Sequence, residues 1–162
     1  GEPVQLGIVG ALNSTIQNIR QSGFEDTVAA NADVEFVGVV DGQNVSEVAL
    51  AAAETLITAN PGLNAIYATG EPALVGAVAA VEAQGAQDRV TVFGWDLTAQ
   101  VIAGIDEGFV KAVVQQDPAL IASVSIETLI ASLNGEEVES VVGVPITIVT
   151  AENVDAFRAI FE

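Results

Sequence analysis

The sequence contains no histidine and no cysteine among its 162 residues. Their absence excludes Ser-His-Asp and Cys-His nucleophilic catalysis and removes the usual zinc ligands, leaving only oxygen ligands for a hard metal ion. The only lysine, Lys111, lies in a strand-like stretch and is the one candidate for Schiff-base chemistry. Catalysis would therefore have to rely on carboxylates. We expect a chain that is not an enzyme and that uses neither a cofactor nor a metal.

Basic residues are also scarce. Four of them, Arg20, Arg89, Lys111 and Arg158, stand against 22 acidic residues, and the formal net charge is −18. Such a chain repels nucleic-acid phosphates and anionic lipids, so we expect no nucleic-acid partner. Solubility explains the charge in general terms, and the near absence of lysine suggests adaptation to salt as a sharper explanation. The absence of cysteine is compatible with an oxidising compartment and equally with cytoplasm.

No apolar run approaches the roughly 18 residues that a membrane span requires, and no basic segment of a signal peptide opens the chain. The start at Gly1 instead of methionine suggests processing or cloning. The length and the hydrophobic fraction of 51% indicate one domain with one core.

Short β-branched runs alternate with longer segments rich in alanine and leucine. This alternation predicts βαβ crossovers and a mostly parallel sheet whose strands are covered on both faces. The predicted fold is α/β, a three-layer, doubly wound, flavodoxin-like sheet of about six strands in a single lobe. We expect strands at 4–9, 34–40, 64–68, 90–93, 109–114 and 144–149, and helices at 16–30, 46–59, 72–84, 98–106, 118–133 and 153–161. In the first helix, Ile16, Ile19, Phe24 and Val28 lie near helical spacing.

In an open α/β sheet, ligands bind beyond the carboxyl ends of the strands. Amides, hydroxyls, isolated carboxylates and one indole follow the predicted strands, a mixture that suits a neutral polyol. Each of these residues also has a purely structural explanation as a helix cap, a turn or a packing residue. The set comprises Asn13, Ser14, Thr15, Asp41, Gln43, Asn44, Thr69, Glu71, Trp95, Asp96, Thr98, Gln115, Gln116 and Asp117.

Other site motifs are incomplete. Gly7 and Gly10 do not begin a dinucleotide fingerprint, because Asn13 occupies the place of its third glycine. There is no Walker sequence. A phosphorelay receiver domain would need an acidic pair after the first strand and a lysine after the fifth, where this chain has neutral residues.

Several segments, in order along the chain, resemble sugar-type periplasmic solute-binding proteins. They lie at Asn18–Phe24, Asn60–Ala68, Gly76–Gly85, Val92–Asp96, Gly108–Pro118 and Pro145–Asn153, and they are similar to family motifs such as R-x-x-G-F, VVGFD and A-T-V-x-Q-x-P. Singly these matches are weak, and together they are specific. The resemblance implies a two-lobed receptor that closes over a sugar, with this chain as its carboxyl-terminal lobe, residues 1–162, and the amino-terminal lobe absent.

The resemblance also implies roles for individual residues. Asp96 matches the aspartate that accepts sugar hydroxyls, Gln116 matches the glutamine before the proline, and Arg20 matches a more structural arginine. Asn18 occupies a position at which ribose binders often have arginine, and Asn44 one at which some members stack an aromatic ring. Gly70 replaces a usual Asn or Asp, so one polar contact is lost. The predicted ligand-binding set is Asn13, Asn18, Asn44, Glu71, Trp95, Asp96 and Gln116.

The function that we expect is therefore binding of a small polar ligand, a monosaccharide, as half of an ABC-transport receptor in the periplasm or another extracytoplasmic location. Its partners would be the sugar, the missing lobe and the membrane permease, and a homodimer of lobes is a further candidate. The alternatives are the effector-sensing lobe of a LacI-type transcription regulator, a stand-alone lobe acting as an interaction module and, remotely, an enzyme acting through Glu71 or Asp96. Upstream sequence would discriminate, since a lipobox or signal peptide indicates transport and a helix-turn-helix indicates regulation.

Overall fold

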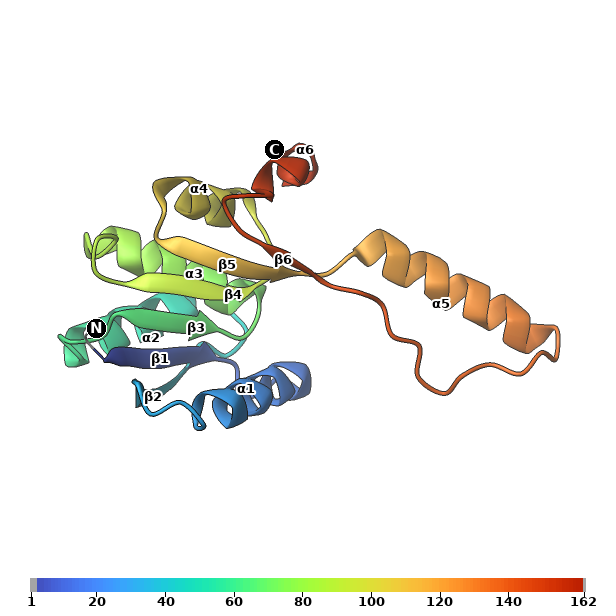
Figure 1. Cartoon of the computed structure of the whole chain (residues 1–162), viewed down its shortest axis with the longest axis horizontal. Helices are drawn as coiled ribbons and strands as arrows, with labels where there is room; N and C mark the ends of the chain where they lie inside the picture. Colours follow the sequence, from blue (N-terminus) through green and yellow to red (C-terminus); the bar gives the residue numbers. More distant parts are fainter. Residues whose placement is uncertain (1–2, 162) are drawn as a thin grey trace.

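A computed structural model describes residues 3–161 and shows a sheet body from which one helical arm projects (Figure 1). Strands and helices alternate throughout, as the hydrophobic pattern predicts. The elements are β1 (Val4–Gly10), α1 (Thr15–Val28), β2 (Val34–Asp41), α2 (Ser46–Ala59), β3 (Ala65–Ala68), α3 (Glu71–Ala83), β4 (Thr91–Trp95), α4 (Ala99–Glu107), β5 (Val110–Gln115), α5 (Pro118–Leu133), β6 (Thr147–Val149), a 3-10 turn η1 (Val154–Ala156) and α6 (Arg158–Phe161).

The sheet has six strands in the order β2-β1-β3-β4-β5-β6. Strands β1 to β5 pair in parallel, and β6 pairs antiparallel with the last three residues of β5. The prediction of a mostly parallel α/β sheet of about six strands is confirmed. The last strand begins later than the predicted residue 144, because Pro145 has no N–H to give to the sheet. The predicted helix at 153–161 is divided into η1 and α6.

The two faces of the sheet are covered unequally. Helices α2, α3 and α4 pack on one face and form the larger core with inward residues such as Ile66, Val92 and Val113. Helix α1 packs on the other face, where Phe24 and Val28 contact a smaller cluster that contains Ile8 and Tyr67. Consecutive strand residues point to opposite faces, so each strand feeds both layers. These two layers hold the loops at the carboxyl ends of β1 to β5 in fixed positions.

Helix α1 is rotated relative to its expected orientation. Ile16 and Ile19 are exposed, whereas Gln17 is 5% exposed and Phe24 packs inward. The predicted helix is present at Thr15–Val28, but only two of the four apolar residues at helical spacing, Phe24 and Val28, pack toward the sheet. Its inward face is polar in the first two turns and apolar in the last two, because the first turns lie beside the polar loops at the carboxyl edge of the sheet.

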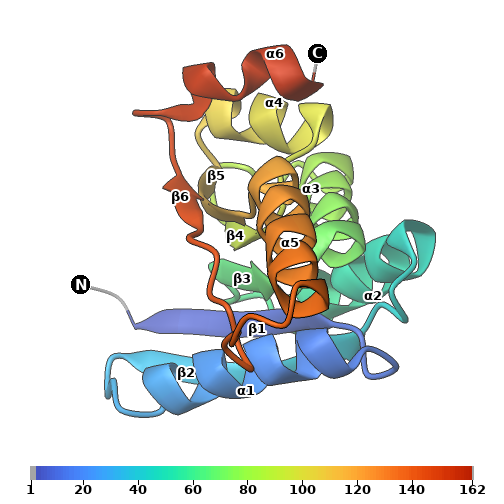
Figure 2. The ribbon, with the colours of Figure 1, turned by 90° about the vertical axis from the view of Figure 1, so that its right-hand side faces the viewer.

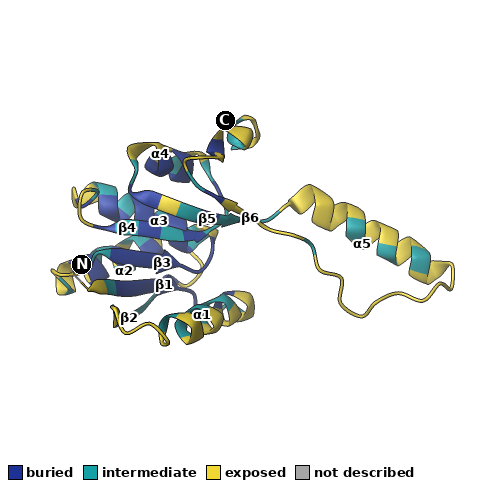
Figure 3. Ribbon diagram, in the orientation of Figure 1, coloured by how far each residue is buried: buried dark blue, intermediate teal, exposed yellow. Residues whose placement is uncertain are grey.

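Helix α5 leaves the sheet body at the end of β5 and projects away from it, and residues 134–146 run back along it to β6 (Figures 1 and 2). None of the residues of α5 is buried. Figure 3 shows the contrast between this exposed arm and the buried strands. None of the helices within residues 3–161 combines the length and apolarity that crossing a membrane requires.

The carboxyl-terminal turn is attached to the body by one arginine. Arg158 donates from Nη1 and Nη2 to the Asp106 carboxylate of α4, over 2.9 and 2.7 Å, and from Nε to Asp155 over 2.7 Å. These hydrogen bonds lower the pKa of Asp106 and raise that of Arg158. The contribution of Asp106 to stability is therefore present above its unfolded pKa and is lost as the pH falls through its folded pKa.

The excess negative charge has few partners, since both ion pairs found in residues 3–161 are made by Arg158. We expect the melting temperature to rise by several degrees between low salt and molar NaCl, because ions screen the repulsion among the carboxylates. Most of the rise should come below about 0.5 M, where the screening length falls most steeply from about 30 Å at 0.01 M. Circular dichroism melts across a NaCl series measure it. A melting temperature unchanged by salt would leave solubility as the only explanation of the charge.

Candidate functional site

The polar residues expected at the carboxyl ends of the strands form a continuous edge of the sheet. The loops that follow β1, β2 and β3 are joined by hydrogen bonds among Gln17, Asn44 and Thr69. The loops that follow β4 and β5 are joined by hydrogen bonds of Asp96, Gln115 and Gln116. This edge is the candidate functional site, and it has two distinct halves.

Asp96 and Gln116 form the centre of the second half. The Gln116 Nε2 donates to Asp96 Oδ1 over 2.9 Å, so residues 20 positions apart in the sequence are in direct contact. Asp96 adopts a φ of 67°, a region that aspartate tolerates better than most residues. Its backbone N–H donates to the carbonyl of Val114, which fixes this turn against β5. The remaining carboxylate oxygen can accept a hydrogen bond from a ligand hydroxyl.

Gln115 contacts the two loops that carry this pair, and it was not in the predicted binding set. It is 7% exposed, accepts a hydrogen bond from the Leu97 N–H over 2.7 Å and donates to the carbonyl of Gln116 over 2.7 Å. It therefore couples the loop that carries Asp96 to the loop that carries Gln116. The signal in the sequence is a glutamine at the last position of an apolar strand. A polar side chain that is buried there needs hydrogen-bonding partners.

A cavity of about 570 Å³ opens beside this pair. Carboxylates and amides form its polar wall, and the carboxyl-terminal turn supplies an apolar wall. Glu71, at the first turn of α3, lines it. Asp117 also lines it, although its side chain accepts from the Leu120 N–H and caps α5. The remaining lining residues include Asp96, Leu97, Gln115, Gln116, Pro118, Thr147, Phe157, Ile160 and Phe161.

The first half of the edge is organised around Gln17, a second residue that the sequence did not single out. Its amide donates to Asn44 Oδ1 over 2.6 Å and accepts from the Thr69 hydroxyl over 2.7 Å. A Cβ on Gly70 would lie only 2.7 Å from this amide. Gln17 thus occupies the space beside residue 70, where the resemblance implies that a polar contact is lost. The sequence signal is a polar residue on the helix face that also carries Phe24 and Val28.

Asn13 and Asn18 use their amides within the same loops. Asn13 donates to the carbonyl of Gln43 over 3.0 Å, and Asn18 donates to the carbonyl of Leu12 over 3.1 Å. Asn18 is not among the residues that line the cavity beside Asp96. The reason is helical geometry, since residues two apart lie on different faces and Arg20 occupies the inward one.

Trp95 points away from the cavity, although it is next to Asp96. The guanidinium carbon of Arg20 lies 3.7 Å from the centre of the indole, and Trp95 Nε1 donates to the Tyr67 hydroxyl over 2.8 Å. Arg20 also donates to the carbonyl of Thr69 over 3.1 Å. The indole is therefore already stacked and hydrogen-bonded on the face of the sheet that α1 partly covers.

Burial is the main cause of the pKa shifts of Arg20 and Tyr67. Burial lowers the pKa of Arg20, and the nearby Asp96 and Tyr67 oppose that shift. Burial raises the pKa of Tyr67, opposed by the hydrogen bond from Trp95 and by the charge of Arg20. Arginine stays protonated in proteins, so Arg20 provides a fixed positive charge near Asp96.

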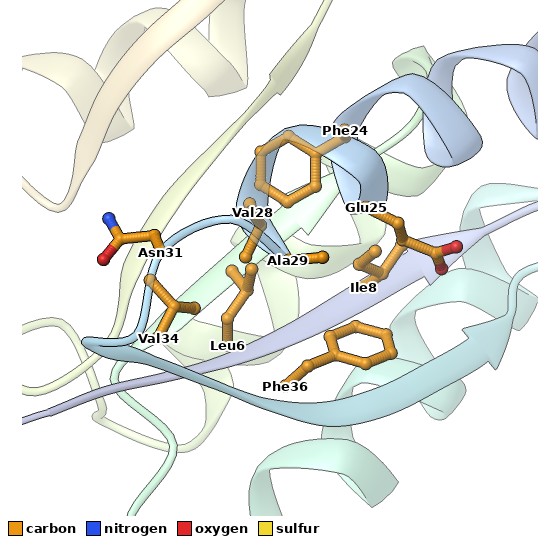
Figure 4. Close-up of a pocket in the computed structure, with 9 residues that line it drawn as sticks. All are labelled: Leu6, Ile8, Phe24, Glu25, Val28, Ala29, Asn31, Val34 and Phe36. Atoms are coloured by element: carbon orange, nitrogen blue, oxygen red, sulfur yellow. The ribbon is translucent and has the colours of Figure 1, made fainter.

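A second cavity, of about 240 Å³, lies between α1 and strands β1 and β2 (Figure 4). Leu6, Ile8, Phe24, Val28 and Phe36 line it, with Glu25 and Asn31 at its margin. Few polar groups converge there, which does not match the pattern of a specific polar site. The edge with Asp96 and Gln116 remains the better candidate.

The candidate site offers hydrogen bonds in fixed positions, with carboxylates as acceptors and amides as both donors and acceptors. Within residues 3–161, acidic side chains nowhere gather in threes at a spacing that would hold a metal ion. The arrangement is suited to recognising several hydroxyl groups of one small molecule.

Comparisons with known proteins show the family and the fold of the chain. A family model described as a periplasmic binding protein domain matches residues 1–137. The D-ribose/D-allose-binding protein of Pseudomonas aeruginosa is 31% identical over 152 residues, which are 91% of this chain and 47% of that protein. The ribose import binding protein of Escherichia coli is 27% identical over 144 residues, or 83% of this chain and 45% of that protein.

A periplasmic solute-binding protein from Actinobacillus succinogenes, solved with bound D-allose, superposes with a TM-score of 0.88 at 26% identity. The match covers 96% of this chain and 56% of that one. The chain therefore spans about half the length of the proteins that it resembles.

Proposed function

This chain belongs to the family of periplasmic binding protein domains, and from that membership we propose that it is one lobe, the carboxyl-terminal one, of a two-lobed sugar receptor. The receptor would bind a monosaccharide by hydrogen bonds and closure of the two lobes, without a covalent step. It would deliver the sugar, in the periplasm, to the membrane permease of an ABC transporter.

The contact between Asp96 and Gln116 is the observation that carries this proposal. It places a carboxylate and a primary amide side by side at the mouth of a cavity, each with hydrogen-bonding capacity left over. Neighbouring sugar hydroxyls, each both a donor and an acceptor, match such a pair. Hydrogen bonds to a charged carboxylate are worth about 1.5–3 kcal/mol each, which is enough to orient a small polyol.

The ligand class follows from the same geometry and from the relatives. The relatives are described as binding D-ribose or D-allose, both neutral and rich in hydroxyls. The charge of −18 on this chain disfavours anionic ligands, whereas it is neutral toward an uncharged sugar. D-ribose and D-allose are therefore the first ligands to test.

One lobe supplies only one wall of such a site. The cavity beside Asp96 lies at an open edge of the sheet, and the matched relatives are about twice as long. We expect the isolated chain to bind D-ribose or D-allose in the millimolar range or not at all, because half of the contacts and the closure are missing. A two-lobed protein containing this lobe should bind one of them at least about a hundredfold more tightly, a difference of roughly 3 kcal/mol.

Titration calorimetry on both proteins measures this difference, with circular dichroism as the control for folding. Micromolar or tighter binding by the isolated chain would contradict the half-site. A two-lobed protein that is folded but binds no neutral sugar would contradict the proposed ligand class.

A further inference from the structure

Two hydrogen bonds in the first half of the candidate site form a short relay from the sheet to the surface. The Thr69 hydroxyl donates to Gln17 Oε1 over 2.7 Å, and Gln17 Nε2 donates to Asn44 Oδ1 over 2.6 Å. Thr69 is 0% exposed and Gln17 is 5% exposed, whereas Asn44 is exposed. The relay therefore has a buried end at Thr69 and an exposed end at Asn44, where a ligand can reach it.

The buried end fixes the direction of the relay. The Thr69 hydroxyl carries one proton and, because it is fully buried, it needs a protein acceptor. The acceptors within reach are Gln17 Oε1 at 2.7 Å and the carbonyl of Val9 at 3.5 Å. The Val9 carbonyl already accepts from the Thr69 N–H over 3.1 Å, and 3.5 Å is long for a hydroxyl donor. The hydroxyl therefore donates to Gln17, and the oxygen of that amide faces Thr69.

The orientation of Gln17 determines that of Asn44. A primary amide carries its oxygen and its NH₂ group on opposite branches, so Gln17 with its oxygen at Thr69 presents NH₂ to Asn44. Asn44 must then accept with Oδ1, and its own NH₂ group lies on the branch that the relay does not use. A reversed Gln17 would place NH₂ against the Thr69 hydroxyl and leave that proton only the long contact to Val9.

Gly70 leaves the space that the Gln17 amide occupies. A Cβ on Gly70 would lie 2.7 Å from Cδ of Gln17 and 2.9 Å from both its Nε2 and its Oε1. The φ of Gly70 is −169°, which any residue adopts, so the close approach and not the backbone conformation calls for glycine here. Glu71, the next residue, lines the cavity beside Asp96. The relay is thus joined to that cavity through the backbone that links Thr69 to Glu71.

We propose that Gln17 is a positioning residue that turns Asn44 so that its N–H groups, and not its oxygen, meet the ligand. The identity of the ligand as a sugar rests on the proposed function, whereas the orientation of Asn44 rests on the relay alone. The first half of the candidate site then offers a donor at Asn44, and the second half offers an acceptor at Asp96. The ligand that fits is a polyol with one hydroxyl that accepts from Asn44 and another that donates to Asp96.

The orientation is tested first without a ligand, in the 162-residue chain. The side-chain NH₂ protons of Asn44 should exchange with water as fast as those of Asn31, another exposed asparagine whose Oδ1 accepts a hydrogen bond. In Gln17→Glu at about pH 8 the carboxylate can only accept, so Asn44 must reverse and donate to it. Exchange at Asn44 should then slow by about tenfold or more, while exchange at Asn31 is unchanged. Heteronuclear NMR with magnetisation transfer from water measures both rates.

Gln43→Glu is the matched control, because it makes the same change at an exposed side chain next to Asn44 and leaves Gln17 intact. It should alter the exchange of the Asn44 NH₂ protons by less than about twofold. Gly70→Ala tests the relay without changing any of its members. The added methyl displaces the Gln17 amide, whose buried NH₂ protons should then exchange about tenfold faster. Circular dichroism melts establish that each variant is folded.

The ligand is tested in a two-lobed receptor that contains this lobe, with D-ribose or D-allose as the probe. In Asn44→Ala, deoxygenation at one position of the sugar should cost no further affinity, which identifies the hydroxyl that faces Asn44. At that position fluorine, which only accepts hydrogen bonds, should bind about threefold or more tightly than hydrogen in the unaltered receptor. Gln17→Glu should abolish this preference, which a loss of stability alone would not do. Titration calorimetry measures each dissociation constant.

Several results would overturn the proposal. Slow exchange of the Asn44 NH₂ protons in the unaltered chain, or no change of that rate in folded Gln17→Glu, would show that Gln17 does not set the orientation. If Gln17→Glu does not fold, unchanged exchange of the Gln17 protons in Gly70→Ala refutes the relay instead. A receptor that keeps its sugar affinity in Asn44→Ala, or its preference for fluorine in Gln17→Glu, would show that Asn44 is not the donor. A folded receptor that binds no neutral sugar would overturn the proposed function and the role of Asn44 toward a sugar, while the measurement without ligand still decides the orientation.

Discussion

Replacing Asp96 with alanine in a two-lobed receptor that contains this lobe should weaken sugar binding by about ten- to a hundredfold. The carboxylate accepts hydrogen bonds from ligand hydroxyls in the proposed site, and each such bond is worth roughly 1.5–3 kcal/mol. Gln116 would lose its partner at 2.9 Å in the same variant, which adds to the loss. Titration calorimetry with D-ribose and D-allose measures the change in dissociation constant.

Two further variants separate the role of the charge from that of the turn. Asp96→Asn keeps the side-chain shape and tolerates the φ of 67°, so it should lose less affinity than Asp96→Ala while melting close to the unaltered protein. Asp88→Ala removes an exposed carboxylate in the turn between α3 and β4, at the amino ends of the strands, and should leave affinity unchanged. If Asp96→Ala binds as tightly as the unaltered receptor, the site lies elsewhere.

Replacing Gly76 with alanine should destabilise the chain by about 1–3 kcal/mol. A Cβ at this position would lie 2.6 Å from the backbone nitrogen of Leu50 and 2.6 Å from the Cβ of Ala49. Helices α2 and α3 would have to move apart, and together they contribute ten of the 26 buried residues of the larger core. A backbone atom cannot yield as a flexible side chain can, so the gain in helix propensity from alanine does not offset the clash.

Gly23→Ala is the matched control, because Gly23 lies inside α1 with no atom within 4 Å of its ideal Cβ. There the same substitution should stabilise the chain by about 0.5–1 kcal/mol through backbone entropy. Urea unfolding followed by circular dichroism measures both changes. Equal shifts of the same sign for the two variants would show that helix propensity, and not the approach of α2 to α3, sets the effect at Gly76.

The sequence by itself determined the α/β class, the parallel sheet and the place of the candidate site. Hydrophobic periodicity distinguishes β-branched strands from Ala-rich helices, and glycine and proline mark their ends. The carboxyl ends of parallel strands meet at one edge, so residues after β4 and β5 had to be neighbours. The contact between Asp96 and Gln116 follows from those two local rules. Their role in binding a sugar stays a prediction.

The tertiary structure decided which way the side chains point. Trp95 and Asp96 are adjacent in sequence, yet the indole lies under Arg20 on the face of the sheet while the carboxylate lines the cavity. Helix α1 turns Gln17 inward and Ile16 outward, because its first turns lie against polar loops and not against a core. Periodicity gives the angle between residues on a helix but not the orientation of the helix relative to its neighbours.

The position of α5 is the clearest case. Its sequence is apolar on more than one side, which predicts a helix packed within a core, and the helix is found where the sequence predicts it. Only the three-dimensional path shows that the chain carries it away from its own sheet, with no buried residue (Figure 1). An apolar pattern predicts that a helix face is buried, because exposing apolar side chains to water is unfavourable whichever surface covers them. Whether the covering surface belongs to the same lobe, to another lobe or to a second copy depends on the path of the connecting segments.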